Sequence, residues 1–273
     1  TADLSKSDLG DVALFVQDGR GNELDQATGF EVVDTGTPAQ GRAARMTNGG
    51  WRMYQAVRRA RPLVAHFHDP ELIPIALALK AKGIKVIYDV HEDLPRQILG
   101  KHWLPTWLRR PVSWAAEGLE WIAGRAFDGI VAATRSFAKR FPADKTVTVQ
   151  NFPILSELVA PDALAYEERP NEFAYVGGLG KIRGSWEMVE AIGRVPTESA
   201  TLQLAGKCSN PADETEVRGL GGWGRVNCLG WADRPTVASV LGRVRAGLVG
   251  ELSARNHINA QPNKMFEYMA AGL

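Results

Sequence analysis

The sequence is poor in the features that identify several broad classes of protein. It has only two cysteines, Cys208 and Cys228, and no metal-ligand spacing surrounds them. This scarcity argues against a disulfide framework and favours a reducing compartment with free thiols. No apolar run approaches the ~20 residues that span a bilayer, and no signal peptide opens the chain. We therefore expect a cytoplasmic protein.

An excess of charge of one sign is also missing, as are repeats and low-complexity tracts. The net charge of +1 argues against nucleic acid as a partner, because a nucleic-acid-binding surface is strongly basic. An apolar content of 45% and a charged content of 23% are ordinary for a soluble globular protein. At 273 residues, the chain has room for one large α/β domain or two of ordinary size.

Apolar strand-like runs alternate with helical segments along most of the chain. In the first half, strands are expected at 12–16, 30–33, 63–68, 85–90, 129–133 and 146–149, and helices at 42–61, 69–82, 94–127 and 135–140. In the second half, strands are expected at 173–176, 201–205, 226–229 and 246–249, with helices between them. The run at 12–16 is continuously apolar, as in a strand buried on both faces. This alternation predicts βαβ units and parallel sheets.

The rhythm is interrupted once. Residues 156–171 contain two prolines and several acids, and they lack a clean period, so we interpret them as a linker. The predicted fold is α/β with two Rossmann-like domains, at 1–155 and 172–273. The chain starts inside a helix-like stretch and stops where another strand is expected. Both domains are therefore expected to be incomplete at their outer termini.

A short helix is expected after Pro262, ending at Gly272. Its spacing places Met265, Phe266 and Met269 on one apolar face, while Lys264 and Glu267 share another side. Two interpretations of these charges stand. They form a surface ion pair, or the start of the helix faces an anionic ligand, with Glu267 placed for hydroxyl groups.

A glycine-rich turn follows the expected strand at 173–176. It contains Gly177, Gly178 and Gly180, then Lys181 and Arg183, before a helix. Glycines let a ligand approach the backbone closely, and N–H groups at a helix start favour phosphate. The spacing fits neither a dinucleotide fingerprint nor a Walker loop, so a purely structural turn is an equal alternative. Together with the terminal helix, the turn indicates a nucleotide diphosphate site.

Histidines and carboxylates follow two expected neighbouring strands. His66, His68, Asp69 and Glu71 lie at the end of the first, and His91 and Glu92 follow the second. The carboxyl ends of parallel strands are where open α/β sheets bind ligands. A His/Asp metal site is conceivable, but no further ligand has a recognisable spacing, and Asp69 is an ordinary helix-capping residue. A histidine here can hold or exchange a proton.

Tryptophans and cations alternate between Lys101 and Arg125. The set comprises Lys101, His102, Trp103, Trp107, Arg109, Arg110, Trp114, Trp121 and Arg125. Two interpretations stand: an amphipathic helix that lies on an anionic lipid surface, or tryptophans that pack on the sheet of the first domain.

Together these motifs resemble the GT-B glycosyltransferases of family 4, the "glycosyl transferases group 1", particularly bacterial cell-surface polysaccharide enzymes. The residues that carry the resemblance are His68–Leu72, Tyr88–Glu92, Val176–Gly178 with Arg183 and Gly184, Leu204–Gly206, and Pro262–Gly272. It covers nearly the whole chain.

The resemblance implies two Rossmann-like domains, with the acceptor on the first and the nucleotide-sugar on the second. Family members generally retain the anomeric configuration without a metal or cofactor. Glu267 matches the glutamate that holds the ribose hydroxyls, and Arg183 matches the residue that grips the diphosphate, with Lys181 assisting. His91 matches the histidine near the reacting sugar. Asp69 and Glu71, with His68 and Glu92, would lie on the acceptor side.

This sequence departs from the family pattern at two positions near the donor. The first glutamate of the paired motif is Asn259 here, which puts the sugar-contacting role in question. Gly178 stands where many members have an arginine, which leaves more of the diphosphate contact to Arg183 or Lys264. We therefore count Gly177, Gly178, Lys181, Arg183, Asn259, Lys264 and Glu267 as donor-binding residues, and His91, Arg183 and Lys264 as catalytic.

The expected reaction is transfer of a sugar from a UDP- or GDP-sugar to a lipid-linked or saccharide acceptor, at or near the inner membrane face. The alternatives are a sugar-nucleotide epimerase or hydrolase of the same fold, or a non-catalytic binding module.

Overall fold

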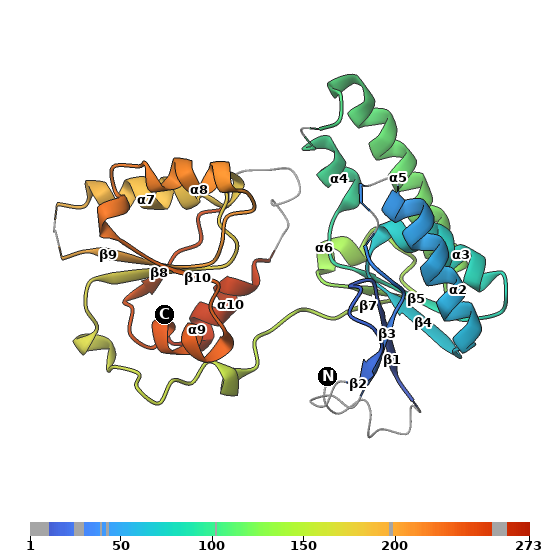
Figure 1. Ribbon diagram of the computed structural model, residues 1–273, viewed down its shortest axis with the longest axis horizontal. Coiled ribbons are helices and arrows are strands. Elements are labelled where there is room, and N and C mark those ends of the chain that lie inside the picture. Colours follow the sequence, from blue (N-terminus) through green and yellow to red (C-terminus); the bar gives the residue numbers. More distant parts are fainter. Residues whose placement is uncertain are drawn as a thin grey trace. The chain divides into compact units, whose positions relative to one another are not determined.

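The computed structural model describes residues 11–24, 30–38, 40–41, 44–101, 103–196, 199–252 and 261–273. The chain divides into two compact units, Thr1–Val149 and Gln150–Leu273. Figure 1 shows both units with their helices and strands labelled.

Parallel strands form the centre of the first unit. Its strands are β1 (Ala13–Val16), β2 (Glu23–Leu24), β3 (Glu31–Asp34), β4 (Val64–Phe67), β5 (Lys85–Val90), β6 (Gly129–Ala132) and β7 (Thr146–Thr148). Strands β4 to β7 make one parallel sheet in the order of the sequence. Strand β3 pairs with β1 in parallel and with β2 antiparallel in a smaller sheet.

The helices of the first unit follow the predicted order with shorter bounds. They are the π-helical turn η2 (Arg45–Gly49), α2 (Gly50–Ala60), the 3-10 helix η3 (Pro70–Leu72), α3 (Ile73–Lys80), α4 (Leu94–Leu99), α5 (Thr106–Ala126) and α6 (Arg135–Ala138). The single helical region expected at 94–127 is two helices. Gly100 ends α4 and Pro105 precedes α5, and both residues disfavour a continuous helix.

The main core of the first unit lies on one face of the β4–β7 sheet. Alternate residues of β5, namely Val86, Tyr88 and Val90, are buried there against α3, α5 and the segment around α6. The opposite face of β5 carries Lys85, Ile87 and Asp89. Asp89 therefore lies on the other side of the sheet from this core.

Strand β1 differs from the expectation of a strand buried on both faces. Leu14 is 49% exposed, and Val12 just before the strand is also exposed. Among the described residues β1 pairs only with β3, so it lies at an edge of the small sheet and not inside the larger one.

The second unit has a parallel sheet between two layers of helices. Its elements are η4 (Leu155–Glu157), η5 (Tyr166–Glu168), β8 (Glu172–Val176), η6 (Lys181–Arg183), α7 (Ser185–Arg194), β9 (Thr201–Ala205), α8 (Pro211–Arg218), η7 (Trp223–Arg225), β10 (Val226–Gly230), α9 (Arg234–Leu241), β11 (Ala246–Gly247) and α10 (Asn263–Ala270). Figure 1 shows α7 and α8 on one side of the sheet, and α9 and α10 on the other. Each layer has its own buried cluster, around Leu202 and Leu241 respectively.

The described strands of the second sheet run in the order β10–β9–β8–β11, and every pairing is parallel. This is the 3-2-1-4 part of a Rossmann sheet. The predicted α/β fold with Rossmann-like parallel sheets is thus confirmed.

The segment expected to be a linker belongs to the second unit. The units divide after Val149, a few residues before the expected boundary at 155. Leu158 and Ala160 are buried, and Leu158 joins the cluster around Leu241. Residues 156–171 lack periodicity because they run over the surface of a sheet–helix layer, touching it at single residues.

Candidate functional site

The second sheet reverses its winding between β8 and β11. The chain adds strands β9 and β10 on one side of β8 and then returns to place β11 on the other side. In open α/β sheets, ligands bind beyond the carboxyl ends of the strands at such a switch point. The glycine turn follows β8 directly, so the fold places it at this point.

The glycine turn needs its glycines for conformation and for close packing. Gly177 has a φ of +132° and Gly184 a φ of +71°, which side chains with a Cβ rarely adopt. A Cβ on Gly184 would also lie 1.9 Å from the carbonyl oxygen of Gly250, in the segment after β11. The turn is therefore locked against the end of β11, and α7 starts immediately after Gly184.

Two predicted cations converge on this turn. A Cβ on Gly177 would lie 3.6 Å from Lys264 Cε and 3.9 Å from Arg183 Nη1, and one on Gly178 would lie 3.8 Å from Arg183 Nη1. Lys264 comes from α10 and Arg183 from η6, so separate parts of the sequence supply them. Two positive groups beside a glycine-rich backbone at a helix start form an arrangement suited to a diphosphate.

Lys264 is buried, and its partners explain how a buried lysine is tolerated. Its Nζ lies 3.3 Å from Glu251 Oε1, 3.4 Å from the Tyr175 hydroxyl, and 4.8 Å from the centre of the Tyr175 ring. The Tyr175 hydroxyl also lies 3.1 Å from the Gly178 carbonyl, to which it donates. Tyr175 thus connects Lys264 to the turn. Arg183 is exposed, and no ion-pair partner for it occurs among the residues that the structure describes.

The other predicted donor residues do not join this group. Lys181 pairs with Glu216 of α8 at 2.7 Å, and Glu267 pairs with Arg234 at 2.7 Å. Arg234 starts α9 and also lies 3.1 Å from Glu157. The interpretation of Lys264 and Glu267 as an ion pair with each other is therefore wrong, because each has a different partner. Asn259 lies outside the described residues.

Helix α10 buries part of its charged side and leaves two methionines of its apolar face exposed. Lys264 and Tyr268 are its buried residues, whereas Met265 and Met269 are exposed. The Tyr268 hydroxyl accepts a hydrogen bond from the Val176 amide at 3.0 Å and donates one to the Leu248 carbonyl at 3.3 Å. Tyr268 thereby fixes α10 to β8 and to the end of β11, and this contact brings Lys264 to the turn. Burial raises the pKa of Tyr268, so it stays a neutral donor.

A second cluster lies at the carboxyl ends of β4 and β5 in the first unit. The Nε2 atoms of His66 and His91 lie 3.3 and 3.2 Å from the same oxygen of Asp89, Oδ2. The ring of His68 meets that of His91 edge-on at 6.0 Å. Burial of Asp89 opposes its ionised form, but hydrogen bonds and charge from the two histidines prevail, and the pKa of Asp89 is lowered. The structure thus brings together His66, His68, Asp89 and His91 at this end of the sheet.

The remaining acceptor-side residues lie nearby on exposed segments. Asp69 precedes η3, but its side chain makes no capping hydrogen bond, so capping does not explain it. Glu71 lies within η3, and Glu92 accepts a hydrogen bond from Gln97 of α4. In the described part of the chain, no group of three or more histidines, cysteines or carboxylates is arranged to hold a metal ion.

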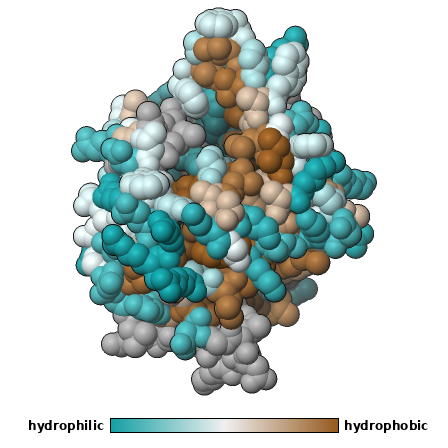
Figure 2. Space-filling view, turned by 90° about the vertical axis from the view of Figure 1, so that its right-hand side faces the viewer, coloured by the Kyte–Doolittle hydropathy of each residue, from teal (hydrophilic) through white to brown (hydrophobic). Residues whose placement is uncertain are grey.

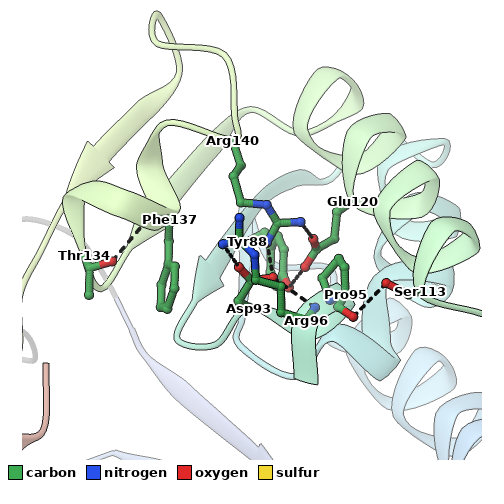
Figure 3. A network of polar contacts seen from close by, with 9 residues as sticks. All are labelled: Tyr88, Asp93, Pro95, Arg96, Ser113, Glu120, Thr134, Phe137 and Arg140. Carbon is green, nitrogen blue, oxygen red and sulfur yellow. Dashed lines mark hydrogen bonds and ion pairs between the residues drawn. The ribbon is translucent and has the colours of Figure 1, made fainter. Parts of the chain in front are cut away.

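An ionic network includes Asp93, two residues after His91 in the chain (Figure 3). Asp93 caps α4 by accepting the Arg96 amide, and it pairs with Arg96 at 2.6 Å and Arg140 at 3.2 Å. Arg140 also pairs with Glu120 of α5 at 2.5 Å, and Glu120 is only 2% exposed. The Tyr88 hydroxyl is 3.5 Å from Glu120. The network joins β5, α4, α5 and the segment after α6, and so anchors the 91–93 loop.

The tryptophans of the 101–125 region face solvent. Trp107, Trp114 and Trp121 are spaced by seven residues on α5, so they form one row, and they are 75%, 68% and 57% exposed. Arg125 lies 3.7 Å from the centre of the Trp121 ring. Figure 2 shows that other, more strongly hydrophobic side chains also reach the surface of this unit. The interpretation that these tryptophans pack on the sheet is wrong for this row. His102 lies outside the described residues.

In the described residues, no helix is both long enough and apolar enough to cross a bilayer.

Three residues at these sites had no role assigned to them from the sequence: Asp89, Tyr175 and Arg234. His66 was considered only for a metal site, and for His66 and Asp89 the alternation of a strand gives a signal. His66 is aligned with Ile87, so it points to the same side of the sheet as Asp89 two residues further on. For Arg234, no local pattern indicates Glu267 as its partner, because 33 residues separate the two.

Comparisons with known proteins identify the family of the chain and its fold. The family model described as "Glycosyl transferase 4-like domain" matches residues 8–151, more than half of the chain. A search of curated proteins finds no match.

Solved structures of several glycosyltransferases have the same fold. Sucrose-phosphate synthase from Thermosynechococcus elongatus is 14% identical with a TM-score of 0.72, and the match covers 96% of this chain and 70% of that one. HepE from Anabaena, in complex with UDP, is 12% identical with a TM-score of 0.65, over 96% and 79% of the two chains. The UDP-forming α,α-trehalose-phosphate synthase from Burkholderia vietnamiensis is 12% identical with a TM-score of 0.65, over 98% and 78%. The chain therefore belongs to the glycosyl transferase 4-like family and is a glycosyltransferase with the GT-B fold.

Proposed function

We propose that this chain transfers a sugar from a UDP- or GDP-sugar to a lipid-linked or saccharide acceptor in cell-surface polysaccharide synthesis. By resemblance to the family, we propose that the reaction retains the anomeric configuration and needs neither metal nor cofactor. The donor nucleotide would lie on the second unit, and the acceptor would lie on the first unit near His68, Asp69, Glu71 and Glu92.

One observation carries the proposal: Arg183 and Lys264 converge on the Gly177–Gly178 turn at the switch point of the second sheet. As the sugar leaves, negative charge grows on the diphosphate. Fixed cations and backbone N–H groups lower the energy of that charged state more than that of the ground state. Arg183, which is exposed, would contact the phosphates directly. Lys264, held by Tyr175 and Glu251, would supply a fixed charge from behind the turn.

Ligands in similar structures support a nucleotide-sugar donor. HepE has been solved with UDP-glucose, and starch synthase IV from Arabidopsis thaliana with ADP and acarbose. We extend the donor class to this chain because Arg183 and Lys264 form a cationic turn that suits a diphosphate. Glu267 would then hold the ribose hydroxyls after leaving Arg234.

We further propose that the enzyme works on the cytoplasmic face of a membrane, bound through α5. The Trp107, Trp114 and Trp121 row offers amphipathic rings to the headgroup region, and Arg110 and Arg125 on the same helix suit anionic lipids. This placement would bring a lipid-linked acceptor to the first unit.

Thermal unfolding of the chain with UDP, GDP and ADP is the direct test of donor binding. Binding to the folded state adds RT ln(1 + [L]/Kd) to the free energy of unfolding and so raises the melting temperature. We expect UDP or GDP to raise it and ADP to act less. No shift with any of the three nucleotides would contradict the proposed donor site.

Turnover assays then separate the proposed reaction from its alternatives. Sugar nucleotides are incubated with and without saccharide and lipid-linked acceptors. Transfer that requires an acceptor supports the proposal. A changed or hydrolysed sugar nucleotide without acceptor would favour an epimerase or hydrolase instead, and binding without any turnover would favour a non-catalytic module.

A further inference from the structure

The Nε2 atoms of His66 and His91 both face one carboxylate oxygen in the cluster on the first unit. They lie 3.3 and 3.2 Å from Asp89 Oδ2. A carboxylate can only accept hydrogen bonds, so a ring nitrogen that bonds to Asp89 must carry a hydrogen. A neutral histidine carries one N–H, so Nδ1 of His91 is left with its lone pair.

The surroundings hold this arrangement in place. Asp89 belongs to the middle of the sheet, between β4 and β6, and its side chain is only 17% exposed. The chain just after His91 is anchored, because Asp93, two residues further on, belongs to the ionic network with Arg140 and Glu120. The side chain of His91 is 41% exposed, so a ligand can reach its ring while Asp89 holds the orientation of the ring.

We infer that Asp89 is a positioning residue that holds His91 with Nδ1 as a hydrogen-bond acceptor for a sugar hydroxyl group. This inference rests on the proposed function, because that function supplies the sugar. His66 contacts the same oxygen of Asp89 as His91 does. This second contact restricts rotation of the Asp89 carboxylate. His68, edge-on to His91, limits the rotation of the His91 ring.

The tautomer of His91 is the first test, and it needs no substrate. Nitrogen-15 spectra of the labelled chain distinguish a protonated Nε2 from a protonated Nδ1. We expect His91 to carry its hydrogen on Nε2. In Asp89→Asn, the new amide group can turn its NH₂ toward Nε2, so we expect a mixture of tautomers or the Nδ1-protonated form. An unchanged His91 spectrum in Asp89→Asn would overturn the inference.

The second test measures transfer from UDP-glucose and GDP-mannose as probe donors, with saccharide acceptors. We expect Asp89→Asn to lower kcat/KM about 10- to 100-fold, the loss that follows from removing a hydrogen bond to a charged group. The affinity for UDP alone should stay the same, because the donor nucleotide is assigned to the second unit.

Asp128→Asn is the matched control. Asp128 is also an ion-paired aspartate of the first unit, bound to Lys80 at 2.6 Å, but it lies at the amino end of β6 and not in this cluster. Both variants are compared by thermal unfolding. A loss of activity in Asp89→Asn that merely parallels its loss of stability, or an equal loss in Asp128→Asn, would mean a structural role only and would contradict the inference.

Failure of the inference can be distinguished from failure of the proposed function. If the unaltered chain neither binds UDP nor GDP nor consumes either probe donor, the proposed function fails, and the sugar in the inference loses its basis. If the unaltered chain is active and Asp89→Asn is equally active, only the role of Asp89 fails.

Discussion

At the scale of single residues, the charged side chains of α10 pair with residues outside their own helix and not with each other. Lys264 and Glu267 are three residues apart on α10, yet one faces Glu251 and Tyr175 and the other Arg234. The two sides of a predicted donor site thus separate: cations at the glycine turn, and a carboxylate near α9. Substitutions should reveal that separation.

Arg183→Ala should weaken binding of UDP or GDP by about 10- to 100-fold, since charge-assisted hydrogen bonds contribute roughly 1.5–3 kcal/mol. Binding of uridine or guanosine should change little. Calorimetric titration of each ligand measures both. Arg194→Ala removes an exposed cation that pairs within α7 and is the control. Equal losses for nucleotide and nucleoside would contradict the diphosphate assignment.

Glu267→Ala should weaken the nucleoside and the nucleotide alike, because the lost contact is to the ribose that both share. The matched variant is Glu157→Ala, which removes the other carboxylate of Arg234. Titration with uridine and guanosine gives the comparison. Unchanged nucleoside affinity in Glu267→Ala, or an equal loss in both variants, would argue against a ribose contact.

Glu120 should make the stability of the chain depend on pH. Burial raises the pKa of Glu120 despite its pairing with Arg140, so the folded state keeps this proton to a higher pH than the unfolded state. Its contribution is therefore most favourable below its unfolded pKa, of about 4.3, and declines as pH rises through the folded pKa. As pH rises through the folded pKa of Glu120, the parent loses this contribution and Glu120→Gln does not. The variant should therefore become progressively more stable relative to the parent.

Urea unfolding of both proteins across this pH range measures the difference. Glu117→Gln, at an exposed position on the same helix, controls for the change from carboxylate to amide. A stability difference that shrinks as pH rises would refute the expected direction.

At the scale of elements, much of the fold follows from local patterns. The expected strands at 85–90 and 201–205 agree with β5 and β9 to the residue, because runs of β-branched and apolar residues end at clear turn signals. The outward face of α10 could not be predicted in this way. The spacing shows an apolar face but not which face is buried, because Tyr268 and Lys264 find specific partners on β8 and after β11, and these contacts decide the orientation.

Gly184→Ala should disrupt the turn between β8 and α7. Its φ is left-handed and a Cβ would overlap the Gly250 carbonyl, so the turn and the end of β11 must separate. We expect a loss of at least about 2 kcal/mol in unfolding free energy, together with loss of UDP or GDP binding. Gly180→Ala is the control, because a Cβ there meets open space. Equal stability of the two variants would show that this packing is unimportant.

The row on α5 should bind anionic membranes. Replacing Trp107, Trp114 and Trp121 by alanine should weaken partitioning onto phosphatidylglycerol vesicles at least about tenfold. The parent itself should bind phosphatidylcholine vesicles, which carry no net charge, much more weakly than phosphatidylglycerol vesicles. Vesicle sedimentation measures this. Trp231→Ala is the matched control, since Trp231 is 72% exposed but belongs to the second unit. Equal sedimentation of the parent and the triple variant with phosphatidylglycerol vesicles would show that this tryptophan row is not a membrane-binding surface.

At the scale of the whole molecule, the division into two units was predictable, but its position was not. Alternation of strands and helices restarts after the irregular stretch, and this restart marks a second sheet. The boundary itself depends on which surface the irregular residues cover, and Leu158 is buried with residues of α9 that lie about 80 positions away in sequence. Such a distant contact leaves no local sequence signal. The same reason explains why Arg234 was missed.

The pairing of Glu267 with Arg234 has a consequence for how tightly a nucleotide binds. In this structure, the Glu267 carboxylate already pairs with a cation of its own chain. Under the proposed function, a ribose would compete with Arg234, and the measured affinity would be the strength of the ribose contact less that of the internal pair. Because the pair is partly exposed to solvent, salt would weaken it and ease the exchange, while the same salt would weaken the proposed contact of Arg183 with the phosphates. The two ends of one nucleotide would then respond to ionic strength in opposite directions.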